Sequence, residues 1–199
     1  MRLKTVVFLS LLVAFLSCNN NGTKDKSLVP DSVGNINSLQ VITPNNLWNS
    51  TVGEAIRNNF AAATDGLPQD EPLFSINQMP PEAFTGFARR NRIFVYVVLS
   101  ENEKVSLATN EYAKPQTGAI IQANSEEKLV ELINKSAEKI IEAFHKSEIK
   151  ERQRRTAISM LKIDTLKKTM GVSMEIPSAY RIAKATDSFV WMRKDLKDG

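Results

Sequence analysis

Apolar residues follow two different patterns along the chain, continuous runs and a helical stripe, which predict a strand-rich middle followed by a long helical region. Residues 92–99 are almost uninterruptedly apolar, β-branched or aromatic, which is typical of a central strand covered on both faces. Shorter runs of the same kind predict other strands. These runs are residues 39–43, 73–76, 105–108, 119–122, 172–176 and 188–192.

The helical region contains neither glycine nor proline between Gly118 and Gly171. Residues 125–150 carry an apolar stripe with a spacing near 3.6, and Asn124 followed by Glu127 predicts a capping box at its start. The stripe fades over residues 151–155 and then resumes, so we expect one very long helix with a bend, or two helices. The predicted fold class is α+β: a mixed, mostly antiparallel sheet with one long helix, or two, packed on one face.

Two further segments have helical features. Apolar residues of the segment 47–60 recur at steps near 3.6, although Gly53 interrupts the pattern. Residues 67–81 hold four of the eight prolines and predict an extended crossing, after which residues 82–89 predict a short helix.

The N-terminal segment combines charge, apolarity and a cysteine in a fixed order. Arg2 and Lys4 precede residues 6–16, all but one of which are apolar, and the chain's one cysteine is Cys18. This order is typical of a signal peptide, with Cys18 left as the first residue of a lipoprotein. The apolar run is shorter than the roughly 20 residues of a spanning helix. The alternatives are that Cys18 ends an ordinary secretory signal, or remains as a free thiol just after one.

We therefore expect three parts. Residues 1–17 are a lipoprotein signal peptide, and residues 18–37 are a flexible tether rich in Asn, Gly, Ser, Asp and Lys. Residues 38–199 form the α+β domain, and whether that domain is truncated at its C-terminus stays open.

Charge and composition argue against several classes of function. Loss of Arg2 and Lys4 from 26 basic residues leaves 24 against 22 acidic ones, a net charge of +2, so no nucleic-acid partner is predicted. No glycine-rich phosphate loop occurs, and one histidine with one cysteine does not supply a zinc site. We predict no cofactor and no metal.

Two segments carry a resemblance to a known group of proteins. They are Leu67-Pro68-Gln69-Asp70-Glu71-Pro72-Leu73-Phe74 and Ser188-Phe189-Val190-Trp191-Met192-Arg193. Together with the N-terminal signal, they resemble Bacteroidota lipoproteins known only as a domain of unknown function. The resemblance implies no activity and no catalytic residues.

The resemblance does imply a location and a modification. Surface-displayed lipoproteins of such bacteria tend to carry acidic residues just after the cysteine, whereas Asn19-Asn20-Asn21-Gly22 follows here. We therefore expect the periplasmic face of the outer membrane rather than the cell surface. These bacteria also glycosylate Asp-Ser/Thr-apolar triplets, which makes Ser32 and Thr165 candidates for O-glycosylation.

Candidate catalytic residues are few. His145, the one histidine, lies at the border of the helical stripe, where we interpret it as a boundary residue. Asp70 and Glu71, in the proline-rich crossing, are the candidate acid–base pair, and each would need a partner carboxylate such as Glu82 or Glu175. The alternative is that the prolines only fix a connection.

Basic and aromatic residues have structural interpretations. The basic positions of the segment 146–155 are interrupted by Glu148 and Glu151, and the spacings Glu148–Arg152 and Glu151–Arg155 predict i,i+4 pairs on an exposed helix. A contact with anionic lipid or glycan is the alternative. Core packing accounts for the larger aromatic residues, which are Trp48, Phe94, Tyr96 and Trp191.

From these observations we expect a lipid-anchored protein of the bacterial cell envelope that acts by binding or assembly without catalysis. Its partners are membrane lipid, through acylated Cys18, and an envelope protein or glycan. The alternative is an envelope hydrolase that uses carboxylates around Asp70 and Glu71 on glycan or cell-wall material.

Overall fold

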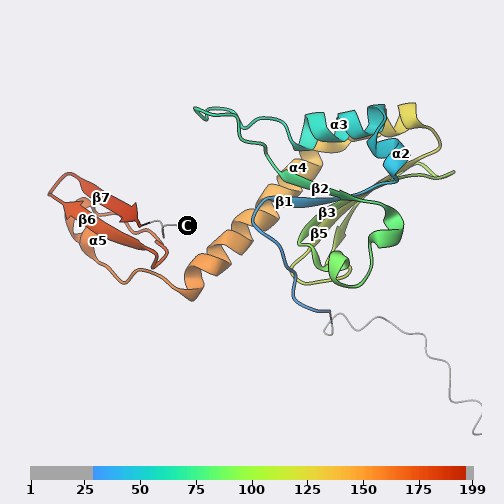
Figure 1. Cartoon of the computed structure of the whole chain (residues 1–199). Helices are drawn as coiled ribbons and strands as arrows, with labels where there is room; N and C mark the ends of the chain where they lie inside the picture. The colour runs from blue at the N-terminus through green and yellow to red at the C-terminus, as the bar shows by residue number, and fades with distance from the viewer. Residues whose placement is uncertain (1–28, 196–199) are drawn as a thin grey trace, which may run out of the picture.

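The computed structural model describes residues 29–195, and the predicted signal peptide and Cys18 lie outside them (Figure 1). In chain order the elements are β1 (Ser38–Ile42), α2 (Asn45–Trp48), α3 (Thr51–Phe60), β2 (Ser75–Met79), η3 (Pro81–Ala83), η4 (Gly86–Arg90), β3 (Ile93–Leu99), β4 (Lys104–Thr109), β5 (Thr117–Ala123), α4 (Glu126–Ile158), α5 (Thr165–Met170), β6 (Tyr180–Ala185) and β7 (Val190–Lys194). The fold is α+β, as predicted. None of the helices in this described part is long and apolar enough to cross a membrane.

The main sheet has five strands in the order β2-β1-β3-β5-β4, and β3 is its centre, as predicted. The sheet is mixed, but the expectation of a mostly antiparallel sheet is wrong. The pairs β1–β2, β1–β3 and β3–β5 are parallel, and the hairpin β4–β5 alone is antiparallel within this sheet. The connection from β1 to β2 contains α2 and α3, and such a helical crossover is what makes neighbouring strands parallel.

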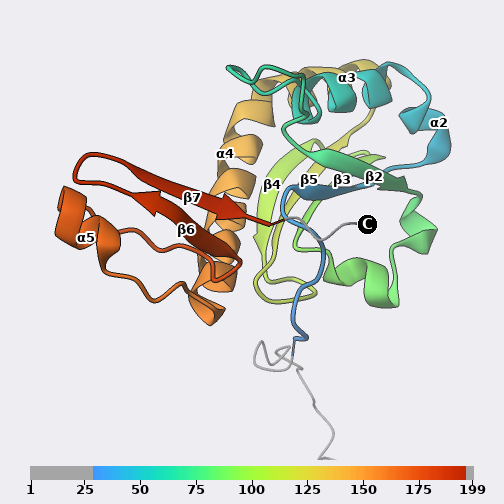
Figure 2. The ribbon, with the colours of Figure 1, turned by 60° about the vertical axis from the view of Figure 1, so that its left-hand side comes forward.

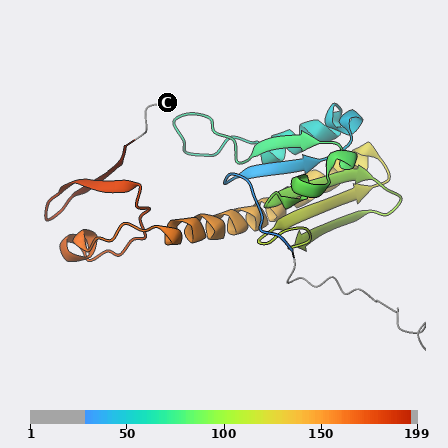
Figure 3. The ribbon, with the colours of Figure 1, turned by 60° about the horizontal axis from the view of Figure 1, so that its bottom comes forward.

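The helices α3 and α4 pack on one face of the sheet and form the main core with it (Figure 3). The stripe predicted for α4 is the buried one: Leu129, Ile133, Ala137, Ile140 and Phe144. Phe144 contacts Phe74 edge to face, with ring centroids 5.9 Å apart. The predicted packing of one long helix on one face is confirmed.

The opposite face of the sheet is covered by η3, η4 and the loop after β4. Phe84 and Phe94 are buried there, with ring centroids 5.5 Å apart, and Tyr112 packs against both. Gly118 lies under the Phe94 ring, where a Cβ atom would come within 2.1 Å of Cζ. The absence of a side chain at Gly118 therefore makes room for this aromatic cluster.

Helix α4 is one continuous helix of 33 residues, about 50 Å long, and therefore longer than the predicted 125–150 segment. Its N-cap is Ser125, whose side chain accepts a hydrogen bond from the Lys128 backbone N–H, rather than Asn124. The helix runs past the edge of the sheet (Figures 1 and 3), and Ile149 and Ile158 on this outer half are 58% and 72% exposed.

The described part of the predicted tether is packed against the domain. Ser32 N–H donates to the Lys114 carbonyl at 3.0 Å, and Val33 N–H donates to the Arg90 carbonyl at 2.8 Å. The flexible tether predicted for residues 18–37 therefore cannot extend to residue 37. Residues 30–37 belong to the folded domain, because their backbone groups are paired with it.

Beyond α4, residues 159–195 form a smaller unit of α5 and the antiparallel hairpin β6–β7 (Figure 2). The strand predicted for residues 172–176 does not form, and β6 was not predicted. Trp191 is 51% exposed, so its predicted core position is wrong, whereas Phe94 is buried and Trp48 and Tyr96 are half-buried.

Candidate functional site

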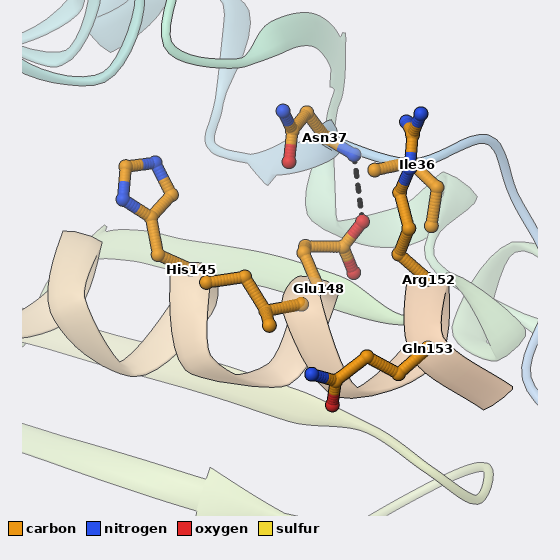
Figure 4. A pocket seen from close by; sticks show the side chains of 7 residues that line it. Ile36, Asn37, His145, Glu148, Arg152 and Gln153 are labelled. Atoms are coloured by element: carbon orange, nitrogen blue, oxygen red, sulfur yellow. Dashed lines mark hydrogen bonds between the residues drawn. The ribbon is translucent and has the colours of Figure 1, made fainter. Parts of the chain in front are cut away.

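A cavity of about 350 Å³ lies between the outer half of α4 and the segment that leads into β1 (Figure 4). Figure 4 shows His145 and Arg152 on either side of Glu148, facing the segment that carries Ile36 and Asn37. The lining residues are Ile36, Asn37, His145, Glu148, Ile149, Arg152 and Gln153. This volume falls in the range of small-molecule sites.

Glu148, which lines the floor of the cavity, forms a buried ion pair with Arg92 behind it. Arg92 Nε donates to Glu148 Oε1 at 2.6 Å, and Arg92 Nη2 donates to Glu148 Oε2 at 3.0 Å. The two side chains are only 2% and 1% exposed. A bidentate pair fixes the orientation of the guanidinium plane relative to the carboxylate plane. The Glu148 side chain is therefore held rigidly, and the charge of Arg92 compensates its negative charge.

The same ion pair holds the segment 34–37 in place. Arg92 donates to the carbonyl oxygens of Gly34 (3.2 Å) and Asn35 (2.8 Å), and the Asn37 backbone N–H donates to Glu148 Oε2 at 2.6 Å. Asn37 has a φ of 59°, the left-handed region that asparagine tolerates better than most residues. The buried pair therefore fixes one wall of the cavity.

His145 forms the end of the cavity nearest the sheet. Its ring packs against Phe74 with centroids 5.1 Å apart, and the side chain is half-buried. This position agrees with the predicted boundary residue on α4, and it also places the ring in the cavity lining, which the sequence did not indicate.

A second cavity of about 250 Å³ continues the first along α4. It shares Ile36 and Arg152 with the first cavity and adds Arg155, Thr156 and Pro177. Arg155 Nη2 donates to the Gly34 carbonyl at 2.9 Å, which ties this stretch of α4 to the same N-terminal segment. We call the two cavities together the α4 groove.

Glu151 organises the arginines at the outer end of the groove. Arg154 donates to both oxygens of this carboxylate at 2.7 and 2.9 Å, and Arg155 Nε donates to Oε1 at 2.7 Å. The side chain is 4% exposed. The hydrogen bonds from Arg154, and then from Arg155, lower the pKa of Glu151 from 4.5 to about 2 although burial opposes them.

Glu151→Gln is expected to lower the free energy of unfolding at pH 7 by about 1–2 kcal/mol, discounted because both arginines are partly exposed. A carboxylate whose pKa is depressed on folding stabilises the native state above its unfolded pKa. That stabilisation is lost as the pH falls toward about 2. In urea unfolding at pH 7, 4 and 3, the gap between wild type and variant should shrink with pH. A gap that stays constant down to pH 3 would contradict this assignment.

The five basic residues of the segment 146–155 do not form a single patch. Lys146 and Lys150 line a different cavity, of about 330 Å³, beside β4 and β5. Arg152 lies in the groove, whereas Arg154 and Arg155 pair with Glu151. The predicted pair Glu151–Arg155 is confirmed; the predicted pair Glu148–Arg152 is wrong, because Glu148 turns inward to Arg92.

Asp70 and Glu71 do not form an acidic site. Both are exposed, in a loop that leaves α3 and returns to β2. They line none of the described cavities, and Glu175 lies in the smaller unit beyond α4. Within residues 29–195 no three His, Cys, Asp or Glu side chains are grouped as a metal site would require. The geometry gives the hydrolase alternative no support.

The two candidate glycosylation positions lie in folded segments. Ser32 is half-buried where the N-terminal segment meets the domain, and Thr165 is half-buried as the first residue of α5. Their modification stays a prediction. Cys18 lies outside the described residues.

Comparisons with known proteins divide the chain where α4 ends. Residues 32–157 match the family described as Domain of unknown function (DUF8532), and residues 159–199 match the one described as Domain of unknown function (DUF4837). The first match covers the sheet, α3 and nearly all of α4; the second covers the smaller unit. No curated protein and no solved structure matches the chain.

Proposed function

The chain belongs to the DUF8532 family, and we propose that it is a lipid-anchored protein of the bacterial cell envelope that acts by binding or assembly without catalysis. The anchor is acylated Cys18, and the location is the periplasmic face of the outer membrane in a bacterium of the Bacteroidota. The partner is an envelope protein or glycan, in addition to the membrane lipid itself.

The proposed lipid anchor is supported by the order of residues in the N-terminal segment. A basic start, a short apolar run and a single cysteine are the features of a lipoprotein signal. Two acyl signals hold a protein stably on a membrane, whereas one chain gives only marginal binding. A Cys18 that carries two or more acyl chains is therefore sufficient for stable attachment.

The α4 groove supports a role in binding. The buried Arg92–Glu148 pair holds one side of the groove rigidly. The Ile149 side chain, which lines the groove, is 58% exposed and so available for contact with a ligand. The acidic residues that hydrolysis would need are dispersed over separate parts of the described chain. A preformed cavity in which acidic side chains are not grouped favours binding of a ligand over its hydrolysis.

Cys18→Ser is expected to move the protein from the membrane fraction to the soluble envelope fraction when the full chain is expressed in a host with lipoprotein processing. Detergent phase partition measures the change: wild type enters the detergent phase, and the variant stays in the aqueous phase. Asn21→Ser, a substitution just beyond the anchor, is the matched control and should behave as wild type. A Cys18→Ser protein that still enters the detergent phase would show that the anchor is elsewhere.

A further inference from the structure

The α4 groove combines an apolar slot with a guanidinium, that of Arg152, which has no ion-pair partner among residues 29–195. Ile36 and Ile149 provide the apolar walls of the larger cavity, and the His145 ring closes one end. Ile149 is 58% exposed, and it is not one of the residues that α4 buries in the core. An exposed isoleucine in a cavity wall offers contact area to a ligand that brings its own apolar part.

The sign of the charge follows from the ion pairs around the cavity. Of the seven residues that line the larger cavity, Glu148 and Arg152 carry a formal charge. Glu148 is neutralised by Arg92, whereas Arg152 takes part in none of the ion pairs or side-chain hydrogen bonds formed within residues 29–195. The neighbouring Arg154 and Arg155 both form ion pairs with Glu151. The groove therefore presents one free guanidinium.

Arg152 lies where the two cavities meet, since it lines both of them. A ligand head group at this position could reach Arg152 while an apolar chain lies along Ile149 toward His145. Guanidinium binds carboxylate and phosphate oxygens in a planar, bidentate manner, which a neutral or cationic head group cannot reproduce.

We infer that the α4 groove binds a single-chain amphiphile with one anionic head group, a carboxylate or a phosphate, with its head at Arg152 and its chain between Ile36 and Ile149. This inference rests on the binding role proposed above, but it does not rest on the lipid anchor. A polyanion such as nucleic acid is disfavoured, because the two lysines of the segment 146–155, Lys146 and Lys150, line a different cavity.

The test is fluorescence titration of the full chain carrying Cys18→Ser with dansylaminoundecanoic acid, a fluorescent fatty acid. We expect the emission to rise and shift to the blue on binding, and Arg152→Gln to weaken binding about tenfold or more. Lys150→Gln removes one positive charge from the same helix at a side chain that lines a different cavity, and it should leave the affinity unchanged. Ile149→Ser should also weaken binding, without altering the preference for an anionic head.

Competition identifies the head group. Dodecanoate or dodecyl phosphate should displace the probe. Stronger displacement by dodecanoate indicates a fatty acid as the ligand, and stronger displacement by dodecyl phosphate indicates a phosphorylated lipid. Dodecanol and dodecyltrimethylammonium should displace it at least tenfold less well. Equal affinity of Arg152→Gln and wild type, equal displacement by dodecanol, or no binding of the probe would each overturn the inference. Those results would leave the detergent-partition result for Cys18 untouched, so the two proposals fail separately.

Discussion

Replacing Glu148 with glutamine is expected to lower the free energy of unfolding by about 3–5 kcal/mol, the largest effect predicted for a single residue of this chain. Glutamine keeps the shape of the side chain but leaves the Arg92 guanidinium buried without a counter-charge. Its amide nitrogen would also face a donor: Arg92 Nε if it takes the place of Oε1, or both Arg92 Nη2 and the Asn37 N–H if it takes the place of Oε2. Equilibrium unfolding in urea measures the change.

The matched control is Glu138→Gln, an exposed glutamate on the same helix, which should change the stability by less than about 0.5 kcal/mol. The double variant Arg92→Met/Glu148→Leu, which removes both charges, should recover part of the loss, because the backbone groups of residues 34, 35 and 37 still lose the hydrogen bonds of the pair. Hydrogen exchange adds a local readout, because the Asn37 N–H should exchange faster in Glu148→Gln. Equal stability of Glu148→Gln and Glu138→Gln would show that the pair is not buried as described.

Gly53→Ala is expected to destabilise the protein by about 1–3 kcal/mol, the opposite of the usual effect in a helix. Alanine normally stabilises a helix interior by about 1 kcal/mol relative to glycine. At Gly53, however, a Cβ atom would lie 1.9 Å from the Trp48 carbonyl oxygen, so α2 and α3 would have to separate. Thermal unfolding followed by circular dichroism measures the change.

A control for this substitution is Asn58→Ala, at an exposed position of the same helix, where the ordinary helix propensity should apply. Asn58→Ala should therefore leave the midpoint of thermal unfolding unchanged or raise it slightly. If Gly53→Ala also raised the midpoint, the close packing of α2 on α3 would be disproved.

The elements with long, regular patterns could be predicted from the sequence. The run 92–99 corresponds to β3, and the stripe from Leu129 to Phe144 is the buried face of α4. Strand direction was predicted wrongly, although the helical segment between the first two strands indicated a crossover and hence parallel pairing. The unit beyond α4 was predicted least well, because its strands are short and its large apolar residues, such as Trp191, are exposed.

The site depended on a pairing that local patterns cannot reveal. Glu148 and Arg92 are 56 residues apart, whereas sequence spacing indicates only neighbours three or four positions away on a helix. Arg92 at the edge of an otherwise apolar strand was the one available signal, because a charge beside a buried strand needs a buried partner. The groove itself arises from segments 36–37 and 145–156 together with Pro177, which only the tertiary fold brings together.

The most direct test of the proposed anchoring is the intact mass of the protein extracted from the membranes of its own host. We expect a chain that begins at Cys18 and carries the added mass of acyl groups on that residue. A chain that retains Met1, or one that begins after Cys18 and carries no lipid, would contradict it.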